Sequence, residues 1–183
     1  MKSHGKLRWA GKRVYLRRVE KKDCAEFIRL VRKSRKFYRG LVSPPRERSQ
    51  FLAWVKRGDE ADAARFVVCR VEDGTILGAI NVSHIIHGNL NSAFVGYYVG
   101  ARFARQGYMT EALALTLRFA FQRLRLNRLE ANIQPRNLSS KSLVRRAGFV
   151  REGMSRRYLR VCGRWQDHER WAMLAEDWRR RRR

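Results

Sequence analysis

A strand, a basic loop that carries glycine, and an amphipathic helix follow one another between residues 92 and 124. This order constrains the chain more than any other feature. Residues 93–99 are apolar, β-branched or aromatic, which is typical of a buried strand. From Tyr108 the apolar residues recur at three- and four-residue steps, which predicts a helix with one buried face. The first N–H groups of a helix have no partner within it, and the helix dipole places partial positive charge there. The segment therefore predicts an anion site that suits a diphosphate.

The periodicities along the rest of the chain predict one α/β domain over residues 1–178, in the order β-α-α-β-β-β-α-β-α-β-β. An Asp73-Gly74 pair predicts a tight hairpin turn. The five arginines at 179–183 read as a basic, disordered tail. We expect strands at 12–19, 64–72, 76–86, 92–99, 128–134, 149–161 and 165–174, and helices at 22–38, from Pro44 through 58, at 108–124 and at 137–148.

Composition limits the class of protein. No stretch approaches the roughly 20 apolar residues of a membrane span, and the N-terminus lacks the apolar core of a signal peptide. Cys24, Cys69 and Cys162 are odd in number and widely spaced, which favours free thiols over disulfide bonds or metal ligands. We therefore expect a cytoplasmic protein that uses no metal.

The net charge of +26 is unusual, and 33 of the 42 basic residues are arginine. Such a field attracts polyanions, repels cationic substrates such as polyamines, and suits bidentate contact with phosphate. Arginine richness is equally expected from a GC-rich genome, and the sequence leaves both explanations open.

Four collinear blocks carry a resemblance over roughly residues 12–178. They are "GAINVSHIIHGNLNSAFVGYYVG", "QGYMTEAL", "RLEANIQPRNLSSKSLVRRAGFVREG" and "YLRVCGRWQDHERWAML". Together they resemble the GNAT superfamily of N-acetyltransferases, in particular the RimJ/RimL-type ribosomal-protein-alanine N-acetyltransferases, and most closely the RimJ type. The general coenzyme A loop of that family reads Arg/Gln-x-x-Gly-x-Gly/Ala. Here only Gly107 agrees with it, since Ala104 and Met109 occupy the outer positions.

The resemblance implies the GNAT fold, a mixed and mostly antiparallel twisted sheet flanked by helices. In that fold the strands at 92–99 and 128–134 splay apart, and acetyl-CoA enters the wedge between them. Main-chain groups of Tyr98 and Val99 would pair with the pantetheine arm, which Asn137 would also contact. The pyrophosphate would be held by the N–H groups of Arg105, Gln106, Gly107, Tyr108, Met109 and Thr110.

The resemblance also gives Ser140 the role of protonating the coenzyme A thiolate, although Asn137 and Ser140 would equally cap a helix start. Val144 stands where many GNAT enzymes carry a tyrosine acid, so that acid is excluded there. The general base stays open, because Phe94 stands where relatives often have Glu. His84 and His87 are candidates, and so are Asp167 and His168, which match a RimJ-type block. Glu111, in the first turn of a predicted helix, is expected to serve the helix dipole.

An acceptor that needs little help from a base is an N-terminal α-amine, whose pKa is about 7.7–8.0, against about 10.4 for lysine. We expect direct acetyl transfer to such an amine, by resemblance the N-terminal alanine of a ribosomal protein, with electrostatic contact to ribosomal RNA. Two alternatives remain. The acceptor could be a small amine or an antibiotic, or the chain could be a ribosome- or RNA-binding assembly factor with a degenerate transferase site.

Overall fold

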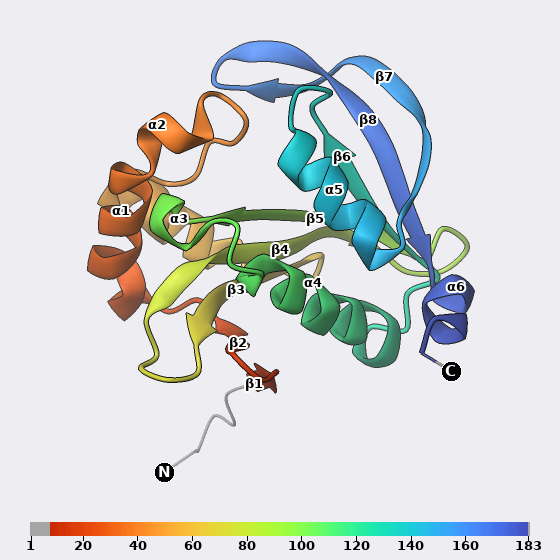
Figure 1. The fold of residues 1–183 in the computed structure, drawn as a ribbon, viewed down its shortest axis with the longest axis horizontal. Coiled ribbons are helices and arrows are strands. Elements are labelled where there is room, and N and C mark those ends of the chain that lie inside the picture. The colour runs from red at the N-terminus through yellow and green to blue at the C-terminus, as the bar shows by residue number, and fades with distance from the viewer. Residues whose placement is uncertain (1–7, 183) are drawn as a thin grey trace.

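The computed structural model describes residues 8–182, which form one eight-stranded sheet in the order β1-β2-β3-β4-β5-β6-β8-β7 (Figure 1). Neighbouring strands are antiparallel except β5 and β6, which are parallel. This mixed, mostly antiparallel sheet confirms the predicted fold class. The strands are β1 (Arg8–Ala10), β2 (Val14–Arg18), β3 (Ala63–Arg70), β4 (Ile76–Ile86), β5 (Ser92–Val99), β6 (Arg128–Ile133), β7 (Val150–Val161) and β8 (Arg164–Leu174).

The helices lie close to the predicted ranges. They are α1 (Cys24–Lys33), α2 (Arg35–Tyr38), α3 (Arg48–Lys56), α4 (Tyr108–Arg118), α5 (Leu138–Ala147) and α6 (Ala175–Arg180). A π-helical turn, Phe119–Arg123, continues α4. Among the helices of residues 8–182, none combines the length and apolar character that a membrane span requires.

The ranges predicted for two helices are longer than the helices observed. The helix expected at 22–38 breaks at Ser34, whose hydroxyl donates to the Leu30 carbonyl and accepts from the Ala101 N–H, at 2.8 and 2.9 Å. The helix expected from Pro44 begins only at Arg48, because Glu47 is extended with φ −128° and ψ 157°.

The sequence did not predict β1 or α6. The tail expected to be disordered contributes Arg179 and Arg180 to α6, while Arg183 lies outside the described residues. Trp178 explains this helix, since it is buried and its ring centroid lies 5.4 Å from that of Phe121.

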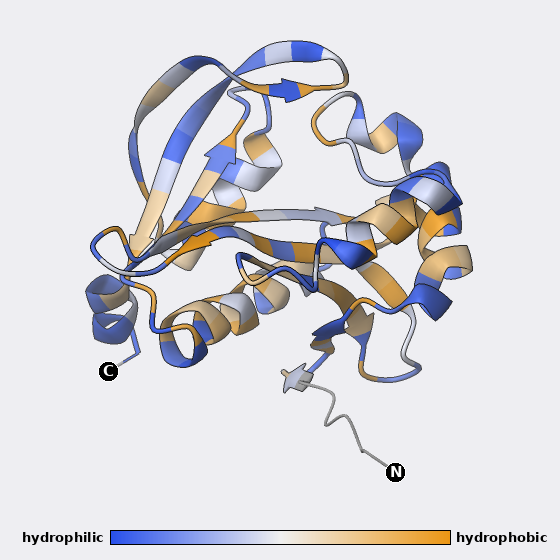
Figure 2. Ribbon diagram, turned by 180° about the vertical axis from the view of Figure 1, so that it is seen from behind, coloured by the Kyte–Doolittle hydropathy of each residue, from blue (hydrophilic) through white to orange (hydrophobic). Residues whose placement is uncertain are grey.

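The core lies at the centre of the sheet. Val67 and Val68 are adjacent on β3 and both fully buried, and neighbouring side chains on a strand point to opposite faces. Both faces of the sheet are therefore covered there, which explains why the central strands are nearly continuous apolar runs. Figure 2 shows hydrophobic residues concentrated on the central strands and the helices against them, and hydrophilic residues over much of the β7–β8 hairpin.

The parallel pair β5–β6 positions the site. Ser92–Phe94 pair with Arg128–Glu130, but β5 continues to Val99 and β6 to Ile133 with no further pairing between them. Beyond Phe94 the outer edge of β5 is therefore free of strand partners. The two strands part as predicted, and the helices that follow them, α4 and α5, begin beside the gap.

Candidate active site

A groove of about 1110 Å³ opens where β5 and β6 part. Its walls are the end of β5, the starts of α4 and α5, and α2 with the loop that follows it. The groove brings together most of the predicted site residues: Tyr98, Val99, Arg105, Gly107, Tyr108, Met109, Thr110, Asn137 and Ser140.

The start of α4 presents unsatisfied backbone donors to this groove. Gly107 caps the helix with φ 81°, and Arg105 has φ 62°, so the loop adopts the left-handed conformation twice. The N–H groups of Thr110 and Glu111 bond to the Gly107 carbonyl. No residue of the described chain accepts from the N–H groups of Gly107, Tyr108 and Met109. Three free donors at the positive end of a helix are suited to an anion.

Basic side chains also line the groove. They are Arg13, Arg105 and Arg146, and Glu111 is the one carboxylate among the lining residues of the described chain. That carboxylate accepts from the Arg13 N–H at 2.8 Å and lies 3.6 Å from the Arg13 Nε. Glu111 therefore ties the turn before β2 to the first turn of α4, and the groove keeps an excess of positive charge. No motif in the sequence marks Arg13, which reaches this site from a turn that lies far away along the chain.

The register of β4 against β5 decides which main-chain groups face the gap. The Gly100 N–H donates to the Leu77 carbonyl of β4 at 2.8 Å. Main-chain groups alternate sides along a strand, so those of Tyr98 also point to β4, opposite Ala79. Those of Tyr97 and Val99 point to the gap. The prediction for Val99 is compatible with this geometry. The main-chain role predicted for Tyr98 is not, because its groups face β4.

The side chain of Tyr98 lies on the other wall of the groove. Its ring centroid is 6.0 Å from that of Phe27 and 6.2 Å from that of Tyr38. The hydroxyls of Tyr98 and Tyr38 are both buried, and that of Tyr98 finds no hydrogen-bond partner among residues 8–182. Burial raises the pKa of Tyr98 well above its ordinary value, so its hydroxyl stays protonated. The sequence showed Tyr38 only as an aromatic residue at the end of an amphipathic helix, a pattern shared with ordinary core residues.

The start of α5 is capped by Asn137 and contacted by the Tyr97 hydroxyl. The Asn137 Oδ1 accepts from the Ser140 N–H at 3.2 Å, so Asn137 caps the helix as its residue type predicts. The Tyr97 hydroxyl donates to the Ser140 carbonyl at 3.4 Å. Burial raises the pKa of Tyr97 to about 12, although a hydrogen bond with Ser140 acts in the opposite direction. The Tyr97 hydroxyl, which holds its proton at neutral pH, therefore lies against the start of α5, and Tyr97 and Ser140 both line the groove.

The structure does not bring the predicted bases to the groove. His84 is exposed at a bulge near the far end of β4, and its ring lies 5.7 Å from that of Phe94. Like His84, His87 and Phe94 do not line the groove. His84 was chosen for its chemistry, but it lies five positions along β4 from Ala79, away from the part of β5 that lines the groove.

Asp167 and His168 are also engaged elsewhere. The Asp167 carboxylate accepts from the Arg157 N–H at 2.7 Å, where it braces the irregular pairing of β7 with β8. The His168 ring is buried, with Nδ1 2.9 Å from the Gln166 carbonyl oxygen, and burial lowers its pKa. The Gln106 side chain turns back to donate to the Arg102 carbonyl at 2.8 Å and does not line the groove.

Comparison with known proteins now identifies this groove. Residues 13–150 match the family model of the acetyltransferase (GNAT) domain. The chain belongs to the GNAT acetyltransferase family. It is an acetyl-CoA-dependent N-acetyltransferase, and the free N–H groups at the start of α4 fit the diphosphate of that cosubstrate.

Individual GNAT relatives extend this assignment. The chain is 31% identical to the probable N-acetyltransferase YjcK of Bacillus subtilis, over 91% of this chain and 97% of the relative. It is 33% identical to the ribosomal protein uS5-alanine N-acetyltransferase of Escherichia coli, over 58% of this chain and 55% of that enzyme. Its fold matches that of Mycobacterium smegmatis RimJ in complex with CoA-disulfide, with a TM-score of 0.81 and 29% identity over 89% and 82% of the two chains.

Proposed function

We propose that this GNAT enzyme transfers acetyl from acetyl-CoA directly to the N-terminal α-amine of a protein, namely a ribosomal protein that begins with alanine. The relatives named for uS5-alanine acetylation and for RimJ support this acceptor class. The positive field of the chain supports contact with ribosomal RNA as the enzyme meets its substrate.

Different walls of the groove bind different parts of acetyl-CoA. The N–H groups of Gly107, Tyr108 and Met109 hold the diphosphate, with Arg105 and Thr110 beside them. The free main-chain groups of Tyr97 and Val99 hold the pantetheine arm, and Asn137 orders the start of α5 next to it. The hydroxyls of Tyr97 and Ser140 form the pair from which a departing thiolate takes its proton.

One observation carries the choice of acceptor. Among the lining residues of the described chain, 8–182, Glu111 is the only carboxylate and no histidine occurs, and Glu111 is held by Arg13. Because these residues offer no free base, the amine must arrive mostly unprotonated. Near pH 7.5 roughly a third of α-amines are neutral, against about a thousandth of lysine side chains. Positive groups around the groove lower the pKa of a bound amine further, which also disfavours polyamines.

Peptide acetylation tests this proposal. One octapeptide begins with a free alanine, a second has a blocked N-terminus and one internal lysine, and a panel of small amines and aminoglycosides completes the assay. Mass spectrometry locates the acetyl group. We expect acetylation of the α-amine of the first peptide alone. Turnover confined to the small amines would overturn the proposal, and failure to bind acetyl-CoA at millimolar concentration would favour an assembly factor with a degenerate site.

A further inference from the structure

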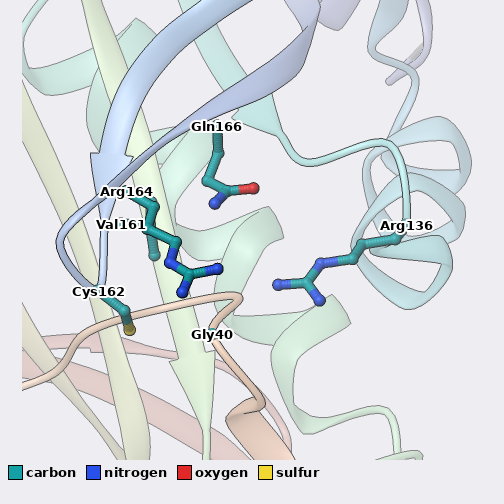
Figure 3. A pocket seen from close by; sticks show the side chains of 6 residues that line it. All are labelled: Gly40, Arg136, Val161, Cys162, Arg164 and Gln166. Atoms are coloured by element: carbon teal, nitrogen blue, oxygen red, sulfur yellow. The ribbon is translucent and has the colours of Figure 1, made fainter.

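A second cavity, of about 450 Å³, lies between the turn of the β7–β8 hairpin, the loop after α2 and the loop after β6 (Figure 3). Gly40 and Arg136 line it. Their immediate neighbours along the chain, Leu41 and Asn137, line the acetyl-CoA groove. The two spaces therefore share two wall segments, and a peptide whose N-terminus reaches the groove can pass the cavity.

The charges of this cavity are of one sign. Arg136 and Arg164 extend toward one another from facing elements, with the Gln166 amide beside them (Figure 3). None of the six residues lining the cavity is acidic: Gly40, Arg136, Val161, Cys162, Arg164 and Gln166. Two facing guanidinium groups repel each other unless an anion lies between them.

Hydrogen bonds to uncharged acceptors hold the Arg136 guanidinium in place, and they leave its charge without a counter-charge. The Arg136 Nε donates to the Gln134 Oε1 at 3.1 Å, and its Nη2 donates to the Arg39 carbonyl at 3.2 Å. Within residues 8–182 the Arg164 guanidinium and the Gln166 side-chain amide make no hydrogen bond or ion pair. The neighbouring acidic residue, Asp167, already accepts from the Arg157 N–H. The cavity therefore holds a positioned cation, a second free cation and a free amide donor.

The cavity also owes its form to parts of the chain beyond the family match. Val161, Cys162, Arg164 and Gln166 belong to the hairpin after residue 150, where the match to the GNAT family model ends. The Ser43 Oγ lies 3.5 Å from the Cys162 Sγ, which links the loop between α2 and α3 to the hairpin turn. The β7–β8 hairpin therefore supplies one wall of the cavity, next to the groove that the matched domain forms.

We propose that the cavity binds the carboxylate of an aspartate or glutamate that lies within a few residues of the acetylated N-terminus. This proposal rests on the proposed function. A guanidinium group matches a carboxylate with two parallel N–H bonds, and the Gln166 amide can donate a further one. The enzyme would thus choose among N-termini by an acidic residue downstream of the reactive amine.

A glutamate scan tests the cavity. Octapeptides that begin with alanine and are otherwise neutral carry one glutamate at each position from 2 to 6, and each has a matched glutamine peptide. At one or two positions we expect kcat/KM to be about tenfold higher for glutamate, mainly through KM. A general effect of the positive field would instead give the same gain at every position.

Substitutions in the β7–β8 hairpin test whether the preference for glutamate arises in the cavity. Arg164→Gln should abolish the preference for glutamate, and Arg164→Glu should make a lysine peptide better than the glutamate peptide at the same position. Arg156→Gln is the matched control, because Arg156 is exposed on the same hairpin and does not line the cavity. It should keep the preference of the unmodified enzyme.

Two outcomes separate this proposal from the proposed function. Equal kcat/KM for glutamate and glutamine at every position overturns the cavity proposal but leaves N-terminal acetylation standing. If no peptide is acetylated, the proposed function fails, and calorimetry with N-acetylated peptides on the coenzyme A-saturated enzyme decides the cavity. Tighter binding of a glutamate peptide that is lost in Arg164→Gln supports it, and equal binding overturns it.

Discussion

Gly107 is the residue on which the geometry of the anion site depends most. Its φ of 81° belongs to the left-handed region, and a Cβ there would lie 2.8 Å from the Arg13 Nη2. Gly107→Ala should therefore cost about 1 kcal/mol of stability and weaken acetyl-CoA binding about tenfold, because the free N–H groups shift. Calorimetry and urea unfolding measure the two effects.

Gly163→Ala is the control for that substitution. Gly163 has the same φ of 81°, lies in the β7–β8 turn and would place its Cβ in open space. It should show a similar loss of stability with unchanged affinity for acetyl-CoA. Equal loss of affinity in both variants would show that backbone strain, and not the position of the α4 donors, governs binding.

Removal of the Tyr98 hydroxyl tests whether this group serves activity or only the structure. Its hydroxyl is buried without a partner, which is unfavourable in the free protein. Tyr98→Phe should leave the free energy of unfolding unchanged or raise it by up to about 1 kcal/mol, and kcat/KM for acetylation falls only if the bound cosubstrate accepts a hydrogen bond from this hydroxyl. A variant with full activity would contradict a role for this hydroxyl.

At the scale of elements, α5 is held to the sheet by a buried charge cluster. The Glu169 carboxylate of β8 accepts from the Lys141 Nζ of α5 and from the Trp171 indole N–H, both at 3.1 Å. Burial acts to raise the pKa of Glu169, but the hydrogen bond and charge of Lys141 outweigh it, and the pKa is lowered. Because the pKa is lower when folded, the stabilisation is present above the unfolded pKa and lost as pH falls through the folded value.

Glu169→Gln should therefore lower the free energy of unfolding by about 2 kcal/mol at neutral pH. The difference from the unmodified protein should shrink below the ordinary carboxyl pKa of 4.5. Urea unfolding at neutral pH and below the ordinary carboxyl pKa measures this difference in the free energy of unfolding. Glu176→Gln is the control, since its ion pair with Arg180 is exposed and should contribute less than about 1 kcal/mol. A pH-independent difference would contradict the assigned role.

Sequence patterns predicted those elements whose signal is local. The continuous apolar run at 93–99 located β5, the 3.6-residue period after Tyr108 located α4, and the Asn137 cap located α5. The break at Ser34 was unpredictable because it depends on the Ala101 N–H, 67 residues away. His84 and Asp167 were chosen for their chemistry, and only the register and bulges of the sheet could show that neither lines the groove. The tail at 179–180 is helical because Trp178 packs on Phe121.

At the scale of the whole molecule, the charge of +26 predicts salt-sensitive binding to RNA. Each phosphate contact releases counterions, so affinity for a ribosomal RNA fragment should fall about a thousandfold between about 50 and about 200 mM salt if roughly six contacts form. Fluorescence anisotropy with labelled RNA measures the slope. A flat dependence, or no binding at low salt, would assign the arginine content to genome composition.

We propose that a groove between two parting strands holds coenzyme A by main-chain donors at the start of α4. An amide-resolved NMR titration of the full chain with coenzyme A tests this binding mode most directly. We expect the largest shifts at the N–H signals of Gly107, Tyr108, Met109 and Val99, with saturation at micromolar ligand. Unchanged signals at these four residues, whether or not others move, would contradict it.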